Sequence, residues 1–166
     1  MNIVVGKILF FILIMASGAI EIIAVLFNKW DDYGESLWEI SSDDYSTNPY
    51  KLGATMIIFS IAVHVLILLN TLLAIPSSRP IQGAVAMYRS SAMTFYPIGE
   101  TIYSIIYLIV KTDSIDRNTG YIFLGGSVVI LLVAIIVGFI TAYQMKKNIQ
   151  PYWNHTVTPC TLCVPY

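Results

Sequence analysis

Four long apolar segments dominate the order of hydrophobic and polar residues along the chain. Each segment contains 20 to 25 residues with few polar interruptions. An α-helix rises about 1.5 Å per residue and the hydrocarbon core of a bilayer is about 30 Å thick, so each segment can cross that core as a helix. The pattern therefore predicts transmembrane helices over residues 8–27, 52–75, 91–110 and 121–145.

The composition supports this prediction. Hydrophobic residues make up 57% of the 166 residues, charged residues make up 11%, and the mean hydropathy is +0.73. Soluble domains have about 25% charged residues. We therefore expect an all-α membrane protein, a four-transmembrane-helix bundle over residues 1–147 with a tail over residues 148–166. The net charge of −1 and the absence of a basic run exclude a nucleic-acid-binding protein.

The first apolar segment has a second interpretation, a secretory signal peptide. Lys7 precedes the apolar run, and Ser17, Gly18 and Ala19 are small residues of the kind found at cleavage sites. The run continues beyond them to Phe27, which favours a membrane-spanning helix.

The basic residues predict the orientation of the bundle, because Lys and Arg are retained on the cytoplasmic side of short loops. The segments on the same side as the N-terminus, residues 1–7, 76–90 and 146–147, contain no acidic residue. The opposite side holds four basic residues beside eight acidic ones. We therefore expect the N- and C-termini to be cytoplasmic, together with Lys7, Arg79, Arg89, Lys146 and Lys147.

Four strongly polar side chains lie inside the predicted spans and away from their ends: Glu21, His64, Asn70 and Glu100. An ionised carboxylate at the middle of a bilayer costs at least ~2.5 kcal/mol, so these side chains should face the interior of the bundle. His64 and Glu100 lie at similar depths in the membrane, so a contact between their side chains is possible. Such a contact either stabilises the bundle or forms part of a path for protons, and the small number of polar residues favours stabilisation. Pro97, close to Glu100, predicts a kink.

A row of small residues follows one face of the fourth span. The four positions are separated by multiples of four residues, which places them on one side of a helix. Small residues allow two membrane helices to approach closely. The spacing fits both close packing within the bundle and self-association of two chains along Gly126, Ala134, Gly138 and Ala142.

The loop between the first two spans is rich in aromatic and acidic residues. Its aromatic side chains predict a recognition surface on the extracellular side, formed by Trp30, Tyr33, Trp38 and Tyr45. Asp31, Asp32 and Glu35 lack the alternate spacing and the glycine of a calcium-binding loop. We therefore expect no metal site and no cofactor.

The tail contains the two cysteines of the chain, Cys160 and Cys163. Cytosolic cysteines close to a membrane are candidates for reversible palmitoylation. The last three residues, Val164-Pro165-Tyr166, are apolar and could add as a strand to a PDZ-type partner. Three prolines predict an extended and mobile tail.

The span layout and loop lengths, together with Trp30 and the segment Gly34-Glu35-Ser36-Leu37-Trp38, resemble those of tetraspan junction and membrane-organising proteins. The likeness is to claudin-like and MARVEL-like families, and in layout to the short septate-junction proteins of invertebrates. The pair of cysteines that follows in the claudin loop is absent here, and two residues separate Gly34 from Leu37. The resemblance implies a role in adhesion or occlusion between epithelial cells.

Together these observations predict a non-enzymatic protein of the plasma membrane at cell junctions, which organises cell contacts or other membrane proteins. Its expected partners are the lipid bilayer, other membrane proteins and a second copy of itself. Two alternatives stay open. One is an accessory subunit of a larger membrane complex, and the other is a small proton- or ion-coupled transporter that uses Glu21, His64 and Glu100.

Overall fold

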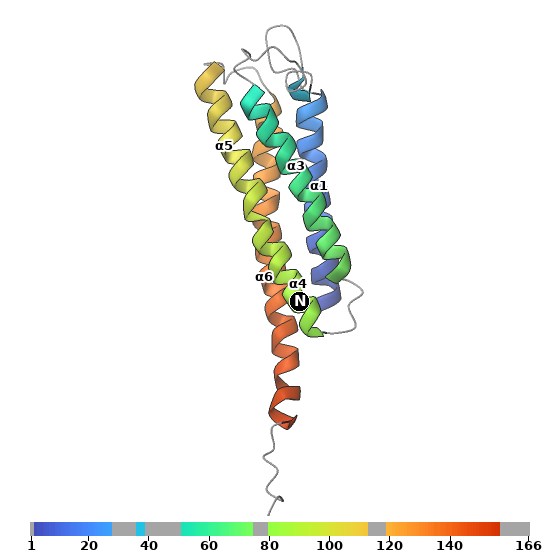
Figure 1. Ribbon diagram of the computed structural model, residues 1–166. Coiled ribbons are helices and arrows are strands. Elements are labelled where there is room, and N and C mark those ends of the chain that lie inside the picture. Colours follow the sequence, from blue (N-terminus) through green and yellow to red (C-terminus); the bar gives the residue numbers. More distant parts are fainter. Residues whose placement is uncertain (1, 28–35, 39–50, 75–79, 113–118, 157–166) are drawn as a thin grey trace, which may run out of the picture.

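The computed structural model describes residues 2–27, 36–38, 51–74, 80–112 and 119–156. These residues form five long helices and one short helical turn at 37–38, without a strand among them. The helices are α1 (Ile3–Phe27), α3 (Lys51–Ala74), α4 (Pro80–Met93), α5 (Phe95–Thr112) and α6 (Thr119–Thr156). In Figure 1, α4 and α5 follow one another end to end, and this pair lies beside α1, α3 and α6 in an elongated bundle.

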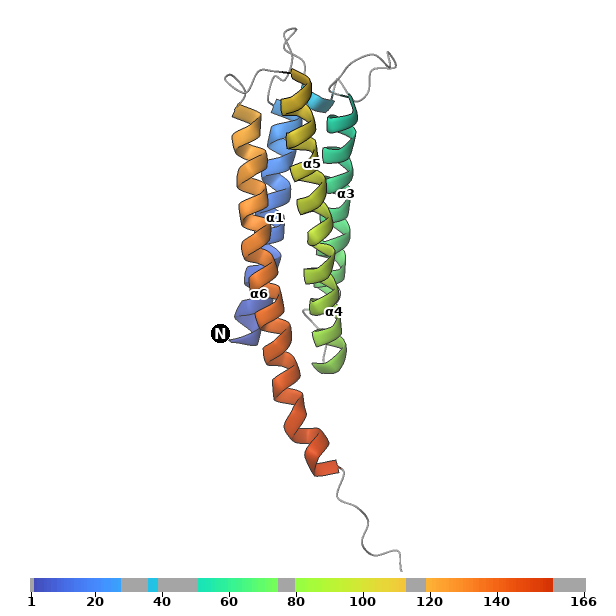
Figure 2. The same ribbon diagram turned by 90° about the vertical axis from the view of Figure 1, so that its left-hand side faces the viewer.

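Four stretches of helix are long and apolar enough to cross a membrane, because α4 and α5 follow one another in a single crossing. The stretches are Ile3–Phe27, Lys51–Leu73, Ile81–Val110 and Gly120–Asn148. The predicted all-α architecture, with four helical stretches long and apolar enough to span a membrane, is therefore confirmed for the described residues. The start of α1 and the far end of α6 lie at the same end of the bundle (Figure 2).

Three helix limits differ by more than two residues from those predicted. The first helix begins at Ile3 rather than residue 8. It includes Lys7, which is buried with 7% exposure, so the charged residue does not mark the start of the helix. The third pass begins at Pro80, since proline is well accommodated in the first turn of a helix. The last helix continues to Thr156, so the expected extended conformation is wrong for residues 148–156.

The third pass is interrupted at Thr94, between α4 and α5. Pro97 has no backbone N–H to donate to the carbonyl group four residues earlier, and its ring crowds that carbonyl, so the helix loses its regular path just before the proline. The hydroxyl of Thr94 donates to the carbonyl oxygen of Ser90 at 2.9 Å, beside the backbone bond between the same residues at 3.2 Å.

The interior of the bundle has three layers along its length. At the end near the N-terminus lies an apolar cluster that includes Phe10, Ile67 and Leu131. At the opposite end lies a second apolar cluster, which includes Ile57 and Leu108. Between the two lies a layer of fully or almost fully buried polar side chains: Ser17, Glu21, Ser60, His64, Thr101, Ser104 and Ser127.

Close packing of α6 depends on Gly138. A Cβ atom at this position would lie 2.9 Å from two ring carbons of Phe10 in α1 and would overlap the hydroxyl oxygen of Ser91 in α4. Ala134 and Ala142, one turn to either side, are fully buried. Gly126 differs from these three, because no atom lies within 4 Å of the position that its Cβ would take. Gly138 and its two alanine neighbours therefore lie inside the bundle.

We predict that Gly138→Ala lowers the free energy of unfolding by about 1–3 kcal/mol, because the added methyl group forces Phe10 and Ser91 aside. Gly126→Ala is the matched control. It should leave this free energy unchanged or raise it slightly, since alanine favours a helix and finds open space there. Unfolding of the purified full chain in detergent micelles measures both. Equal effects of the two substitutions would contradict the packing described for Gly138.

Candidate functional site

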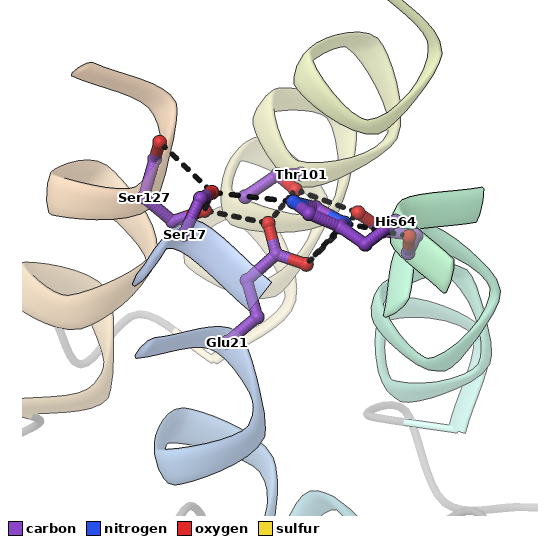
Figure 3. Close-up of polar contacts among 6 residues, drawn as sticks. Ser17, Glu21, His64, Thr101 and Ser127 are labelled. Atoms are coloured by element: carbon purple, nitrogen blue, oxygen red, sulfur yellow. Dashed lines mark hydrogen bonds and ion pairs between the residues drawn. The ribbon is translucent and has the colours of Figure 1, made fainter. Parts of the chain in front are cut away.

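The carboxylate of Glu21 is the centre of the polar layer. Its side chain is fully buried in α1, and three hydroxyl groups from three other helices donate hydrogen bonds to it. Ser127 of α6 and Thr101 of α5 donate to Oε1 at 2.6 and 3.0 Å, and Ser60 of α3 donates to Oε2 at 2.9 Å. One side chain thus connects all four passes of the bundle (Figure 3).

The imidazole ring of His64 completes the layer from α3. Its Nδ1 atom lies 2.9 Å from the carbonyl oxygen of Ser60 and 3.6 Å from Oε2 of Glu21. Its Nε2 atom lies 3.2 Å from the hydroxyl oxygen of Ser17, which is itself 2.8 Å from the hydroxyl oxygen of Ser127. The layer therefore contains a closed ring of polar contacts, with His64 2% exposed.

The contacts allow a proton count. A carbonyl oxygen only accepts, so Nδ1 of His64 carries a proton toward Ser60, and each hydroxyl has a single proton to donate. If Ser127 donates to Glu21, then Ser17 donates either to the hydroxyl oxygen of Ser127 or to its carbonyl oxygen at 3.3 Å, and Nε2 of His64 donates to Ser17. This pattern is complete with a carboxylate and an imidazolium, which form a buried ion pair.

A second complete pattern exists when each of the three protons in this chain shifts to its neighbouring atom, which transfers one net proton from His64 to Glu21. Glu21 then carries the proton and donates to Ser127, Ser127 donates to Ser17, and Ser17 donates to a neutral Nε2 of His64. The two patterns contain the same number of protons and the same heavy-atom contacts. The arrangement can therefore hold a proton at either end, and in both states each atom of the Glu21–Ser127–Ser17–His64 chain has a partner.

The sequence allows a contact between His64 and Glu100, whereas the polar contacts of His64 among the described residues are with Glu21, Ser60 and Ser17. His64 faces Glu21, and Ser60 and Thr101 belong to the same layer. The side chain of Glu100 is partly buried on α5, and its Oε2 atom is buried without a hydrogen-bond partner among the described residues. Position 100 is one residue from Thr101, which is a rotation of about 100° around a helix with 3.6 residues per turn. The two side chains consequently point in different directions.

Asn70 belongs to a separate polar contact, between α3 and α4. Its amide nitrogen donates to the hydroxyl oxygen of Ser90 at 2.8 Å and to the carbonyl oxygen of Ala86 at 3.3 Å. The hydroxyl of Thr71 reaches the same Ser90 oxygen at 3.2 Å. These bonds hold α4 against α3 below the Glu21 layer, toward the end where α1 begins.

Four hydroxyl residues that contact Glu21 or His64 were not predicted from the sequence: Ser17, Ser60, Thr101 and Ser127. Two of them could have been found by their spacing, because Ser17 precedes Glu21 and Ser60 precedes His64 by four residues, which is one turn of the same helix face. Thr101 and Ser127 carry no such signal. Hydroxyl residues are common in membrane helices, and only the packing of α5 and α6 shows that these two face Glu21.

The predicted extracellular surface is described only in part. Trp30, Tyr33 and Tyr45 lie outside the described residues, as do Cys160 and Cys163. Trp38 is described and its side chain is 51% exposed. Its neighbour Leu37 is fully buried in the apolar cluster at the far end of the bundle, against residues such as Ala24 and Leu124.

Comparison of the chain with protein-family models, with curated proteins and with solved structures found no match.

We predict that Glu21→Leu lowers the free energy of unfolding by about 2 kcal/mol. The substitution removes the acceptor of three hydroxyl donors, and hydrogen bonds between membrane helices contribute about 0.6 kcal/mol each on average. Glu100→Leu is the matched control, because it removes a carboxyl group whose buried Oε2 atom has no hydrogen bond among the described residues, and it should leave the stability unchanged or raise it. Denaturant titrations of both variants in micelles test this, and a larger loss for Glu100→Leu would refute it.

Proposed function

We propose that this chain is a non-enzymatic four-pass membrane protein that organises partner proteins at cell contacts. The observation that carries the proposal is the pairing of Leu37 with Trp38 at the end of the bundle away from the N-terminus. Leu37 is fully buried among four helices, whereas Trp38 is 51% exposed. The burial of Leu37 fixes the chain at this point, so the large aromatic side chain of Trp38 is held in a fixed place at the surface.

Such an arrangement is suited to recognition. Tryptophan contributes large contact areas at low cost in conformational entropy and is enriched among the residues that dominate binding energies. The acidic residues of the same loop would attract a partner with a basic surface at a rate that falls with salt. In the proposed orientation both termini are cytoplasmic, which places Trp38 outside the cell, at the plasma membrane. The resemblance to junction proteins in span layout supports the same role.

Proton-coupled transport is the second candidate, and the chain of contacts from Glu21 through Ser127 and Ser17 to His64 favours it. A transport site must also exchange protons with both sides of the membrane. Glu21 is fully buried and His64 is 2% exposed, between an apolar cluster on either side. A polar layer that is closed off on both sides is suited to holding helices together, not to exchanging protons with water. We therefore prefer the organising role.

Trp38→Ala should weaken recruitment to cell contacts by at least about tenfold, because a tryptophan at the centre of an interface contributes about 2 kcal/mol or more. The measurement is the enrichment of the tagged full chain at contacts between cultured epithelial cells. Phe27→Ala is the matched control, since Phe27 is an aromatic residue, 76% exposed, at the same end of the bundle. It should retain the enrichment.

The same cells test the orientation. A tag inserted beside Asp43 should bind antibody without permeabilisation, and tags at either terminus should not. Two results together would place recognition in the segment between α5 and α6 instead. These are unchanged enrichment of Trp38→Ala and loss of enrichment when residues 113–118 are scrambled. A C-terminal tag that binds antibody on intact cells would contradict the orientation.

A further inference from the structure

The two acidic side chains inside the membrane have opposite surroundings. Glu21 is fully buried and accepts three hydrogen bonds. Glu100 lies at a similar depth, because it is next to Thr101, whose hydroxyl donates to Glu21. Its carboxyl group has no hydrogen bond or ion pair with any described residue, and its Oε2 atom is buried. A carboxyl group without a partner is costly at this depth.

Glu100 is partly buried and lies at the edge of a face of α5 that the rest of the bundle leaves uncovered. Tyr96 is 67% exposed and Tyr103 is 49% exposed, one turn to either side of Glu100. Gly99 is exposed, and no atom lies within 4 Å of the position of its Cβ. The ring of Tyr103 stacks on that of Tyr107, with centroids 6.2 Å apart. We call this the α5 outer face: Tyr96, Gly99, Glu100, Tyr103 and Tyr107.

The α5 outer face differs from a helix face that contacts only lipid. Lipid tails offer no hydrogen bonds, yet this face presents a carboxyl group and three tyrosines in a membrane-spanning pass. The glycine beside the carboxyl group leaves a notch where another helix backbone can approach closely. A helix in that notch would cover Glu100 and needs a donor at its depth.

We infer that the α5 outer face binds a transmembrane helix of another protein, which presents a Lys or Arg side chain at the depth of Glu100. A cation pairs with the carboxylate and supplies the missing hydrogen bonds, while the tyrosine rings frame it. The inference concerns contacts within the membrane, so it is independent of the external recognition proposed for Trp38.

A second copy of this chain does not fit the same face. Two copies inserted in the same direction place equivalent residues at equal depth, so a two-fold interface brings one Glu100 toward the other. The basic residues closest along the third pass are Arg89 and Lys111, each eleven residues from Glu100. That separation is about 16 Å of helix. Neither can therefore reach the Glu100 of a parallel copy.

The experiment uses the full chain in lipid vesicles, labelled for energy transfer to a synthetic transmembrane helix of leucine and alanine. One form of this helix carries a single Lys at its centre, and the other carries Leu there. We expect the Lys helix to bind about tenfold more tightly than the Leu helix, and Glu100→Gln to remove that preference. Gly99→Leu, which fills the notch, should weaken binding of the Lys helix similarly.

Two control variants keep the result specific. Tyr143→Leu alters an exposed tyrosine on α6, 62% exposed, and should bind the Lys helix like the unmodified chain. Trp38→Ala should do so as well, so a failure of the external recognition leaves this test intact. The unfolding curve of Glu100→Gln shows whether the variant is folded. Equal binding of the Lys and Leu helices would overturn the inference, as would energy transfer between two copies of the chain that Glu100→Gln abolishes.

Discussion

The arrangement of the four passes depends on the hydrogen bonds that a single buried carboxylate accepts. Glu21 lies where hydrocarbon surrounds the protein and where an unpaired charge costs several kcal/mol. Ser60, Thr101 and Ser127 bring one hydroxyl group each from the other three passes, and hydrogen bonds between membrane helices contribute about 0.6 kcal/mol each on average. Any rearrangement that separates one pass from α1 breaks one of these bonds, so the polar layer fixes the register of all four passes.

The rest of the interior follows from this layer. Apolar clusters pack above and below it, and the close approach at Gly138 brings α6 against α1 and α4. The cluster at the far end also binds Leu37, which fixes the position of Trp38. Helices in a bilayer gain little from the hydrophobic effect, so packing and hydrogen bonds of this kind decide their arrangement. The packing thus links the buried polar layer to the surface proposed for recognition.

The sequence predicts the passes well because length and hydropathy are properties of one segment at a time. It also predicts that Glu21 and His64 avoid lipid, which follows from the cost of burying charge. It does not predict that they face each other, because the rotation of each helix is set by packing with its neighbours. Glu100 shows the limit most clearly: one residue from Thr101, it lies outside the layer to which Thr101 belongs.

The most direct test of a structural role for the Glu21 layer is proton flux across vesicles that contain the purified full chain. A pH gradient is imposed, and a dye inside the vesicles reports proton entry. A structural layer predicts the same rate of entry for the unmodified chain, for Glu21→Gln and for vesicles without protein. Entry above that of protein-free vesicles, abolished in a Glu21→Gln variant that is still folded, would show that the layer conducts protons and would contradict the account.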